Sequence, residues 1–226
     1  MLRILLCVPQ TENLNVIPEI RELTSNHAVT VLNGPVSLND VFQACKNEFD
    51  ILHFGGHGDN KGFRLSATEQ LSATDIAQLS RMSHARIVYL NACGMGEVAG
   101  RISRLIDIRN HKPRYIIYSP QPELKDKEAW QCPLTFYNEL AQNGTKDESS
   151  VITAFLTADA EGTRYNMIIS PNFLESILME LENLRKVQHA PQISITHSQL
   201  VTVILMTAAI MLIIFTIYAL IALRAP

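Results

Sequence analysis

Six short apolar runs alternate along the chain with segments that have the periodicity of helices. Runs that are apolar at every position indicate strands buried on both faces, and their alternation with amphipathic segments is typical of βαβ units. The pattern therefore predicts an α/β fold, in which a mainly parallel six-stranded sheet lies between two layers of helices. The predicted strands cover residues 3–8, 28–33, 50–56, 85–91, 114–119 and 166–170.

Several of the intervening segments carry signals for the start of a helix. Ser72 is followed three residues later by Asp75, which is the spacing of a capping box. The segment LNDVFQACKNEF (38–49) offers Asn39 or Asp40 as the N-cap. Further helices are predicted over 128–142, 149–161 and 172–187. Residues 189–198 contain a proline and no helical period, which indicates a linker.

The last apolar segment differs from the others in length. Residues 200–223, LVTVILMTAAIMLIIFTIYALIAL, contain no charged residue. As a helix these roughly 24 residues would span about 36 Å, more than the hydrocarbon core of a bilayer. A buried core helix is disfavoured because the segment is apolar on all sides. We therefore expect a domain over 1–188, a juxtamembrane linker over 189–199 and a transmembrane helix over 200–223.

Only residues 224–226 follow this segment. We accordingly expect a single-pass, tail-anchored membrane protein whose N-terminal domain lies in the cytoplasm, because the N-terminus lacks the features of a secretory signal. The 226 residues carry a net charge of −3, which gives no reason to expect direct nucleic-acid binding. The four cysteines are widely spaced and form no CxxC pair, which suits a reducing compartment and predicts neither a metal site nor a cofactor.

Two of the apolar runs end abruptly in small residues that surround one reactive side chain. ILHFGGHG (51–58) leads to His57, and IVYLNACG (87–94) leads to Cys93. Since the carboxyl ends of parallel strands meet at one edge of a sheet, neighbouring strands would bring these two side chains together. A helix predicted directly after Cys93 and a nearby imidazolium would favour the thiolate. A thiolate beside a histidine is the working unit of cysteine acyl transfer.

These motifs allow three other interpretations. His53 lies inside an apolar run and is interpreted as a core histidine rather than the base. His53, His57 and Cys93 could together bind zinc, but no fourth ligand stands at a useful spacing. GMGEVA (94–99) fits the GxGxxA dinucleotide pattern, although it follows the fourth predicted strand rather than the first.

LHFGGHG followed by IVYLNACGMGE resembles the two signature blocks of the CHAT domain, a branch of the caspase-like (clan CD) cysteine peptidases. The likeness continues over residues 115–144 and extends to about residues 1–175 in all. The resemblance implies a caspase-like three-layer sandwich. It implies that His57 is the general base and acid, Cys93 the nucleophile, and the N–H groups of Gly58 and Cys93 the oxyanion hole. It also maps Asn91 and Asp126 to substrate-binding positions.

The sequence departs from the family at two points: CGMGE replaces the usual continuation after the cysteine, and Asn91 carries no charge for an acidic or basic P1 residue. We expect a membrane-anchored cysteine endopeptidase that cleaves a protein substrate and is activated by a separate sensor or activator protein, in bacterial antiviral defence or cell death. The alternatives are a catalytically silent scaffold and a membrane-perturbing effector. In the effector, small residues of the apolar helix would support an oligomer.

Overall fold

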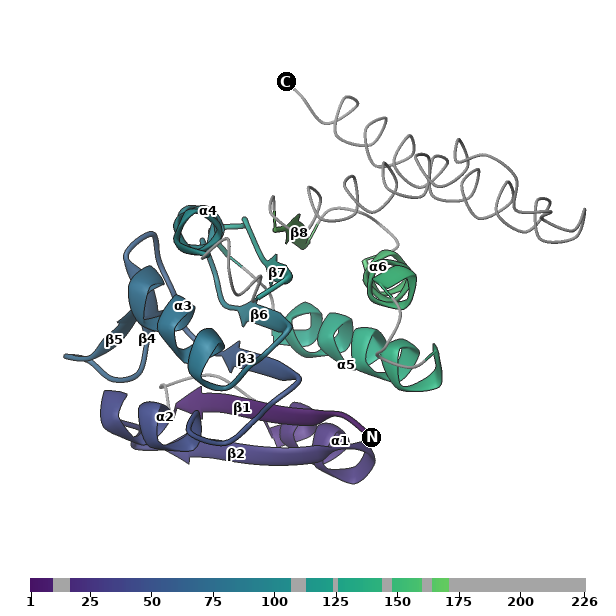
Figure 1. The fold of residues 1–226 in the computed structure, drawn as a ribbon, viewed down its shortest axis with the longest axis horizontal. Helices are drawn as coiled ribbons and strands as arrows, with labels where there is room; N and C mark the ends of the chain where they lie inside the picture. Colours follow the sequence, from purple (N-terminus) through teal and green to yellow (C-terminus); the bar gives the residue numbers. More distant parts are fainter. Residues whose placement is uncertain (10–16, 107–112, 124–125, 144–147, 160–163, 171–226) are drawn as a thin grey trace, which may run out of the picture. The chain divides into compact units, whose positions relative to one another are not determined.

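The main sheet contains the six strands that the apolar runs predict. A computed structural model describes residues 1–9, 17–106, 113–123, 126–143, 148–159 and 164–170 (Figure 1). The strand order is β2-β1-β3-β6-β7-β8, and all neighbours are parallel except β7 and β8. The strands are β1 (Arg3–Pro9), β2 (Ala28–Gly34), β3 (Ile51–Gly55), β6 (Ile87–Asn91), β7 (Tyr115–Tyr118) and β8 (Asn166–Ile169).

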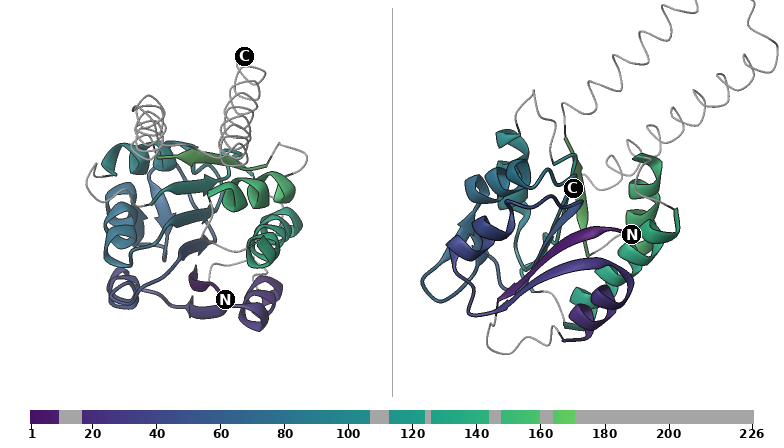
Figure 2. Two further views of the ribbon diagram at one scale, coloured as in Figure 1. Left: turned by 45° about the vertical axis from the view of Figure 1, so that its right-hand side comes forward. Right: turned by 60° about the horizontal axis from the view of Figure 1, so that its bottom comes forward.

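Helices cover both faces of this sheet, as Figure 2 shows with the sheet between two helical layers. Helices α2, α3 and α4 pack on one face, and α1, α5 and α6 pack on the other. The alternation of strands and amphipathic segments thus correctly predicts the layered α/β fold. The helices are α1 (Ile17–Asn26), α2 (Leu38–Ala44), α3 (Ala73–Met82), α4 (Gly96–Leu105), α5 (Asp126–Asn143) and α6 (Glu148–Ala158).

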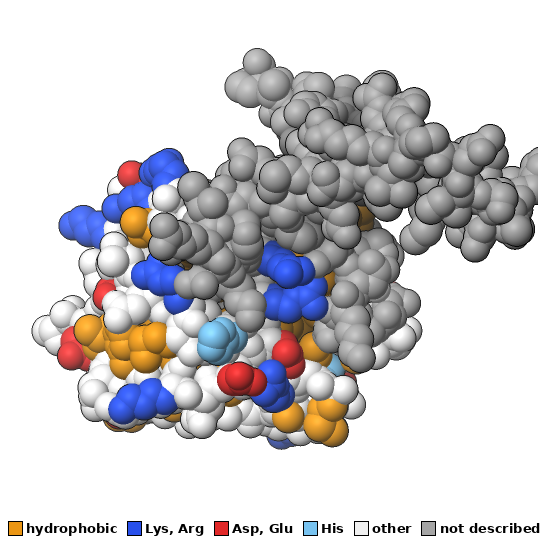
Figure 3. All heavy atoms as spheres, viewed as in Figure 1, with side chains coloured by type: hydrophobic (Ala, Val, Ile, Leu, Met, Phe, Trp, Pro, Cys, Tyr) orange, Lys and Arg blue, Asp and Glu red, His pale blue; other side chains and the backbone are white. Residues whose placement is uncertain are grey.

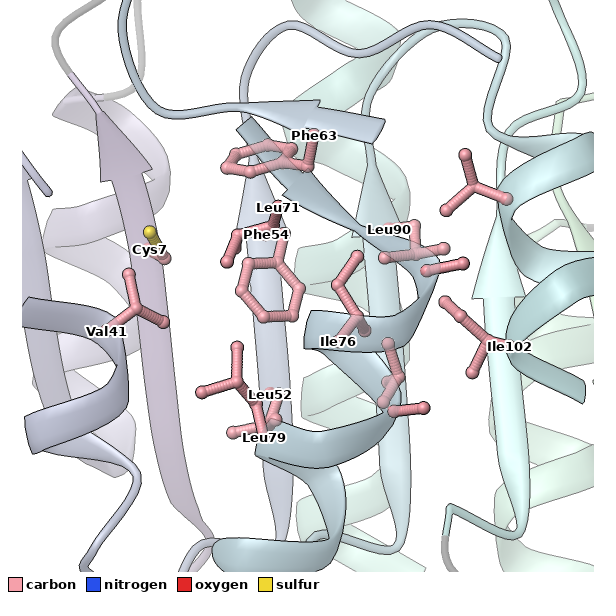
Figure 4. Close-up of a cluster of buried hydrophobic side chains, with 14 of the residues drawn as sticks. Cys7, Val41, Leu52, Phe54, Phe63, Leu71, Ile76, Leu79, Leu90 and Ile102 are labelled. Atoms are coloured by element: carbon pink, nitrogen blue, oxygen red, sulfur yellow. The ribbon is translucent and has the colours of Figure 1, made fainter. Parts of the chain in front are cut away.

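Each face of the sheet has its own hydrophobic core, because successive strand residues point to opposite sides. On the first face Phe54 packs against Phe63 with ring centroids 5.5 Å apart (Figure 4). On the second face Tyr89 packs against Phe136 at 5.6 Å. The strands that carry the candidate site residues, β3 and β6, lie in the middle of the sheet and contribute to both cores.

The helix caps confirm one prediction and correct another. Ser72 caps α3, and its capping box with Asp75 is present as predicted. The N-cap of α2 is Ser37, so the prediction of Asn39 or Asp40 is wrong. Asp40 occupies the third helical position, where its carboxylate accepts the backbone N–H of Ser37 at 2.9 Å. The pattern Ser-x-x-Asp is therefore the same in both helices.

One helix and one two-stranded hairpin were not predicted. Helix α1 follows β1 and packs against the second core through Leu23. A small antiparallel hairpin pairs β4 (Gly62–Arg64) with β5 (Gln70–Ser72). Strands of three residues are too short to show a periodic pattern, so the hairpin gave no clear signal in the sequence.

The predicted C-terminal segments lie outside the described residues. These are the helix over 172–187, the linker over 189–199 and the transmembrane helix over 200–223. Among the described helices, none is both long and apolar enough to cross a membrane.

All described elements fall within one compact unit, Met1–Ile177. On the face shown in Figure 3, Lys and Arg side chains occur in separate groups with Asp and Glu side chains among them.

Candidate active site

The two loops that follow β3 and β6 form the candidate active site. The strands are parallel neighbours, and Gly55 at the end of β3 pairs with Asn91 at the end of β6. His57 and Cys93 each lie two residues beyond this pair. Neighbouring strands are about 4.8 Å apart, so the register places both residues at the same edge of the sheet. This confirms that the strands ending before His57 and Cys93 are neighbours.

The two loops also touch each other directly. The Gly56 N–H donates to the Asn91 carbonyl across a distance of 3.1 Å. A Cβ atom at position 58 would lie 3.0 Å from the Ala92 Cβ and 3.4 Å from the Cys93 carbonyl oxygen, and it would overlap the Met95 sulfur. Gly58 is thus required because its backbone packs against the turn that carries Cys93.

The turn after Cys93 is fixed by the segment that follows β7. The Gly94 N–H donates to the Gln121 carbonyl at 2.7 Å, and the Met95 N–H donates to the Ser119 carbonyl at 3.1 Å. Gly94 has φ +65°, a left-handed conformation that favours glycine. Helix α4 then begins at Gly96. Sequence reasoning did not find Ser119 and Gln121, because they act through backbone carbonyls that carry no residue-type signal.

His57 begins a tight hairpin that connects it to β4. The Arg64 N–H donates to the His57 carbonyl at 2.9 Å, and the Asp59 N–H donates to the Gly62 carbonyl at 3.1 Å. The Asp59 carboxylate accepts the Lys61 N–H at 2.8 Å and the Arg64 guanidinium at 3.1 Å. These hydrogen bonds, led by that from Lys61, lower the pKa of Asp59. The hairpin therefore holds the backbone of His57 in place.

A second contact ties this hairpin to the helix after Cys93. The guanidinium of Arg101 on α4 donates to the Asn60 carbonyl at the tip of the hairpin. The His57 loop is therefore held against the Cys93 loop at Gly58 and against α4 at Asn60. Neither contact was predicted, since both depend on the packing of segments distant in sequence.

The predicted oxyanion hole consists of the Gly58 and Cys93 N–H groups. Within the described residues, neither the Gly58 N–H nor the Cys93 N–H donates a hydrogen bond. Over the same residues no hydrogen bond joins His57 to Cys93. Such bonds are often long in ligand-free sites and tighten only with substrate. The catalytic roles of His57, Cys93 and Gly58 stay predictions; the structure shows that their two loops lie side by side.

His53 lies in the core, as predicted. It is fully buried on β3, and its Nδ1 is 2.8 Å from the Tyr137 hydroxyl. Its ring stacks on Tyr89 with centroids 5.0 Å apart. Burial lowers the pKa of His53 from 6.5 to about 3, so the ring is neutral at physiological pH. A neutral ring packed between tyrosines is suited to a core position rather than to proton transfer with solvent.

The two positions mapped to substrate binding lie in different settings. Asn91 is only 4 % exposed, and its side-chain amide is bonded to Ala129 and Tyr165. Asp126 is the first residue of α5. Their contribution to substrate binding stays a prediction.

Metal and nucleotide interpretations gain no support. Among the residues that the structure describes, no group of three or more His, Cys, Asp and Glu side chains could hold a metal ion. The GMGEVA segment forms the turn and the start of α4 after the fourth strand of the main sheet, whereas the dinucleotide pattern normally follows the first.

A comparison with known families finds a match that covers this site. The model of the CHAT domain family matches residues 9–106, which include β2, β3, β6, α4 and both His57 and Cys93. The match supports the CHAT assignment of this part of the chain and a caspase-like, peptidase-related fold. The resemblance noted over residues 115–144 lies beyond the match. No curated protein matches the chain.

Proposed function

We propose that the protein is a caspase-like cysteine endopeptidase that uses His57 and Cys93. The observation that carries the proposal is the register between β3 and β6. It places a histidine loop and a cysteine loop side by side at the carboxyl edge of the sheet. The close packing of Gly58 against the turn that carries Cys93, which leaves no room for a Cβ atom at position 58, supports the same arrangement.

In the proposed mechanism, the Cys93 thiolate attacks the carbonyl carbon of a peptide bond and a C–S bond forms. The carbonyl oxygen becomes negatively charged and accepts hydrogen bonds from the Gly58 and Cys93 N–H groups. His57 gives a proton to the departing amine, and the C–N bond breaks. His57 then takes a proton from water, which attacks the thioester and releases the carboxylic acid and the thiolate.

The proposal includes a location and an activator. The apolar segment over 200–223 would anchor the chain in a membrane, with the peptidase domain in the cytoplasm. A separate sensor or activator protein would switch the site on, in a bacterial defence or cell-death pathway. The family resemblance and the apolar segment support these points.

The central test compares four forms of the full-length chain, each co-expressed with the products of neighbouring genes. Proteins cleaved by the wild type should remain intact with Cys93→Ala and with His57→Ala. His84→Ala is the matched control, because this histidine is exposed and lies outside the site. All variants should retain the fold, since positions 57 and 93 lie in loops.

The same experiment separates the alternatives. If no protein is cleaved and Cys93→Ala keeps every effect of the wild type on growth, the protein is a scaffold or a membrane effector and not a peptidase. His53→Ala is added as a fifth form: if it rather than His57→Ala abolishes cleavage without loss of stability, the base is His53.

A further inference from the structure

Helix α5 contains a proline in its interior, and the side chain of Asn91 compensates for it. Pro133 has no N–H, so it cannot donate the helical hydrogen bond to the carbonyl of Ala129, four residues earlier. The Asn91 side-chain N–H donates to this carbonyl instead, at 2.7 Å. The end of β6 is thereby bonded to the backbone of α5 at the point where the helix lacks its own donor.

Asn91 also accepts hydrogen bonds through its side-chain and backbone oxygens. Its side-chain oxygen accepts the Tyr165 hydroxyl at 2.6 Å, just before β8. Its backbone carbonyl accepts the Gly56 N–H at 3.1 Å, in the loop that leads to His57. Asn91 is 4 % exposed, and Tyr165 is fully buried. One residue therefore connects four segments: β6, the His57 loop, α5 and the residues before β8.

We propose that Asn91 is a positioning residue that aligns the Cys93 turn with α5 and the His57 loop. The inference rests on the proposed peptidase function, and it replaces the expectation that the Asn91 amide binds the P1 side chain. An amide that is 4 % exposed, with one N–H bonded to Ala129 and its oxygen bonded to Tyr165, is poorly suited to read a substrate.

The chemistry of the two partners explains why asparagine fits here. Ala129 presents a carbonyl, which needs a donor, and Tyr165 presents a hydroxyl, which can give its proton to an acceptor. The asparagine side chain supplies an NH2 group that can donate to the carbonyl and an oxygen that can accept from the hydroxyl, at nearly fixed separation. Aspartate would place a second acceptor against the Ala129 carbonyl, and leucine would supply neither group.

The position of the bond explains how it would act on Cys93. The segment after β7 accepts hydrogen bonds from the Cys93 turn at Ser119 and Gln121. The Asn91–Ala129 bond fixes α5, which follows this segment in the chain. Hydrogen bonds from the Cys93 turn reach Ser119 and Gln121, and the hydrogen bond from Asn91 reaches Ala129, at the start of α5. Among the described residues, the Cys93 N–H donates no hydrogen bond, whereas those of Gly94 and Met95 do.

The first test is Asn91→Asp, measured on the full-length, activated protein with a peptide library that varies P1. We expect kcat to fall roughly 10- to 100-fold with little change in KM, and the P1 preference to stay as in the wild type. The loss should shrink at acidic pH, where the introduced carboxyl gains a proton and can donate to Ala129. A new preference for Arg or Lys at P1 would overturn the inference and support a substrate-binding role.

The second test uses Pro133→Ala, which gives Ala129 its helical donor. Asn91→Ala should lower kcat by a several-fold smaller factor in the Pro133→Ala protein than in the wild type. The reason is that α5 no longer depends on the asparagine for this hydrogen bond. An equal decrease in kcat in the Pro133→Ala protein and in the wild type would contradict the inference. Asn138→Ala is the matched control, since this asparagine is exposed on the same helix.

A third measurement does not depend on activity. Hydrogen exchange of intact Asn91→Ala should be faster than in the wild type at the start of α5 and in β8, and unchanged in β1 and β2. Unchanged exchange in α5 and β8 would overturn the positioning role. If the wild type shows no cleavage that depends on Cys93, the proposed function fails, and hydrogen exchange still decides the role of Asn91.

Discussion

His53 and His57 are four positions apart in the sequence but lie in opposite environments. His53 points into the second core between Tyr89 and Tyr137, whereas His57 lies beyond the end of the strand and is partly exposed. We expect His53→Ala to lower the free energy of unfolding by about 2–4 kcal/mol, because it opens a cavity in the core. Urea denaturation will measure this, with Asn138→Ala, at an exposed position of α5, as the control that should change stability by less than about 0.5 kcal/mol.

The buried state of His53 also predicts a dependence of stability on pH. Its pKa is about 3 in the folded protein and 6.5 when unperturbed, so the unfolded chain binds the proton more tightly. The stability that the neutral His53 ring gives the folded state is fully present above pH 6.5. As the pH falls toward 3, the free energy of unfolding decreases by up to about 1.4 kcal/mol per pH unit. His53→Phe should flatten this part of the curve of unfolding free energy against pH. An unchanged slope in that variant would contradict the buried, neutral histidine.

The four cysteines should differ strongly in reactivity. Burial raises the pKa of Cys45 to about 12 and that of Cys132 to about 11, and it raises the pKa of Cys7 further. A pKa of about 11 leaves roughly a hundredth of the thiolate of an ordinary thiol. Cys93 is partly exposed, so iodoacetamide should modify it first in the folded protein. Mass spectrometry that found Cys132 or Cys45 modified before Cys93 would contradict this packing.

At the scale of elements, the capping boxes should contribute measurably to stability. Ser72 accepts the Asp75 N–H at 3.2 Å at the start of α3, the helix that covers β3 and β6. Ser72→Ala should lower the free energy of unfolding by about 1 kcal/mol. Thr74→Ala, on an exposed neighbour in the same turn, is the control. Equal effects of the two substitutions in urea denaturation would show that the cap contributes nothing specific.

At the scale of the whole molecule, the apolar segment predicts how the chain behaves in cells. The full-length protein should fractionate with membranes, and a chain that ends near residue 188 should be soluble, because the segment over 200–223 is removed. Protease added outside intact cells or spheroplasts should leave the globular domain uncut. Digestion of that domain from outside would contradict both the topology and a cytoplasmic peptidase.

The sequence by itself determined the strands, the layered fold and the two loops that carry His57 and Cys93, because buried strands and glycine-rich ends leave local patterns. It also placed His53 in the core. Only the tertiary structure decided the strand order, and with it the neighbouring positions of the two loops. The bond from Asn91 to the carbonyl that Pro133 leaves without a donor depends on the packing of α5 against β6. Backbone groups and contacts between distant segments have no signature in residue type or spacing.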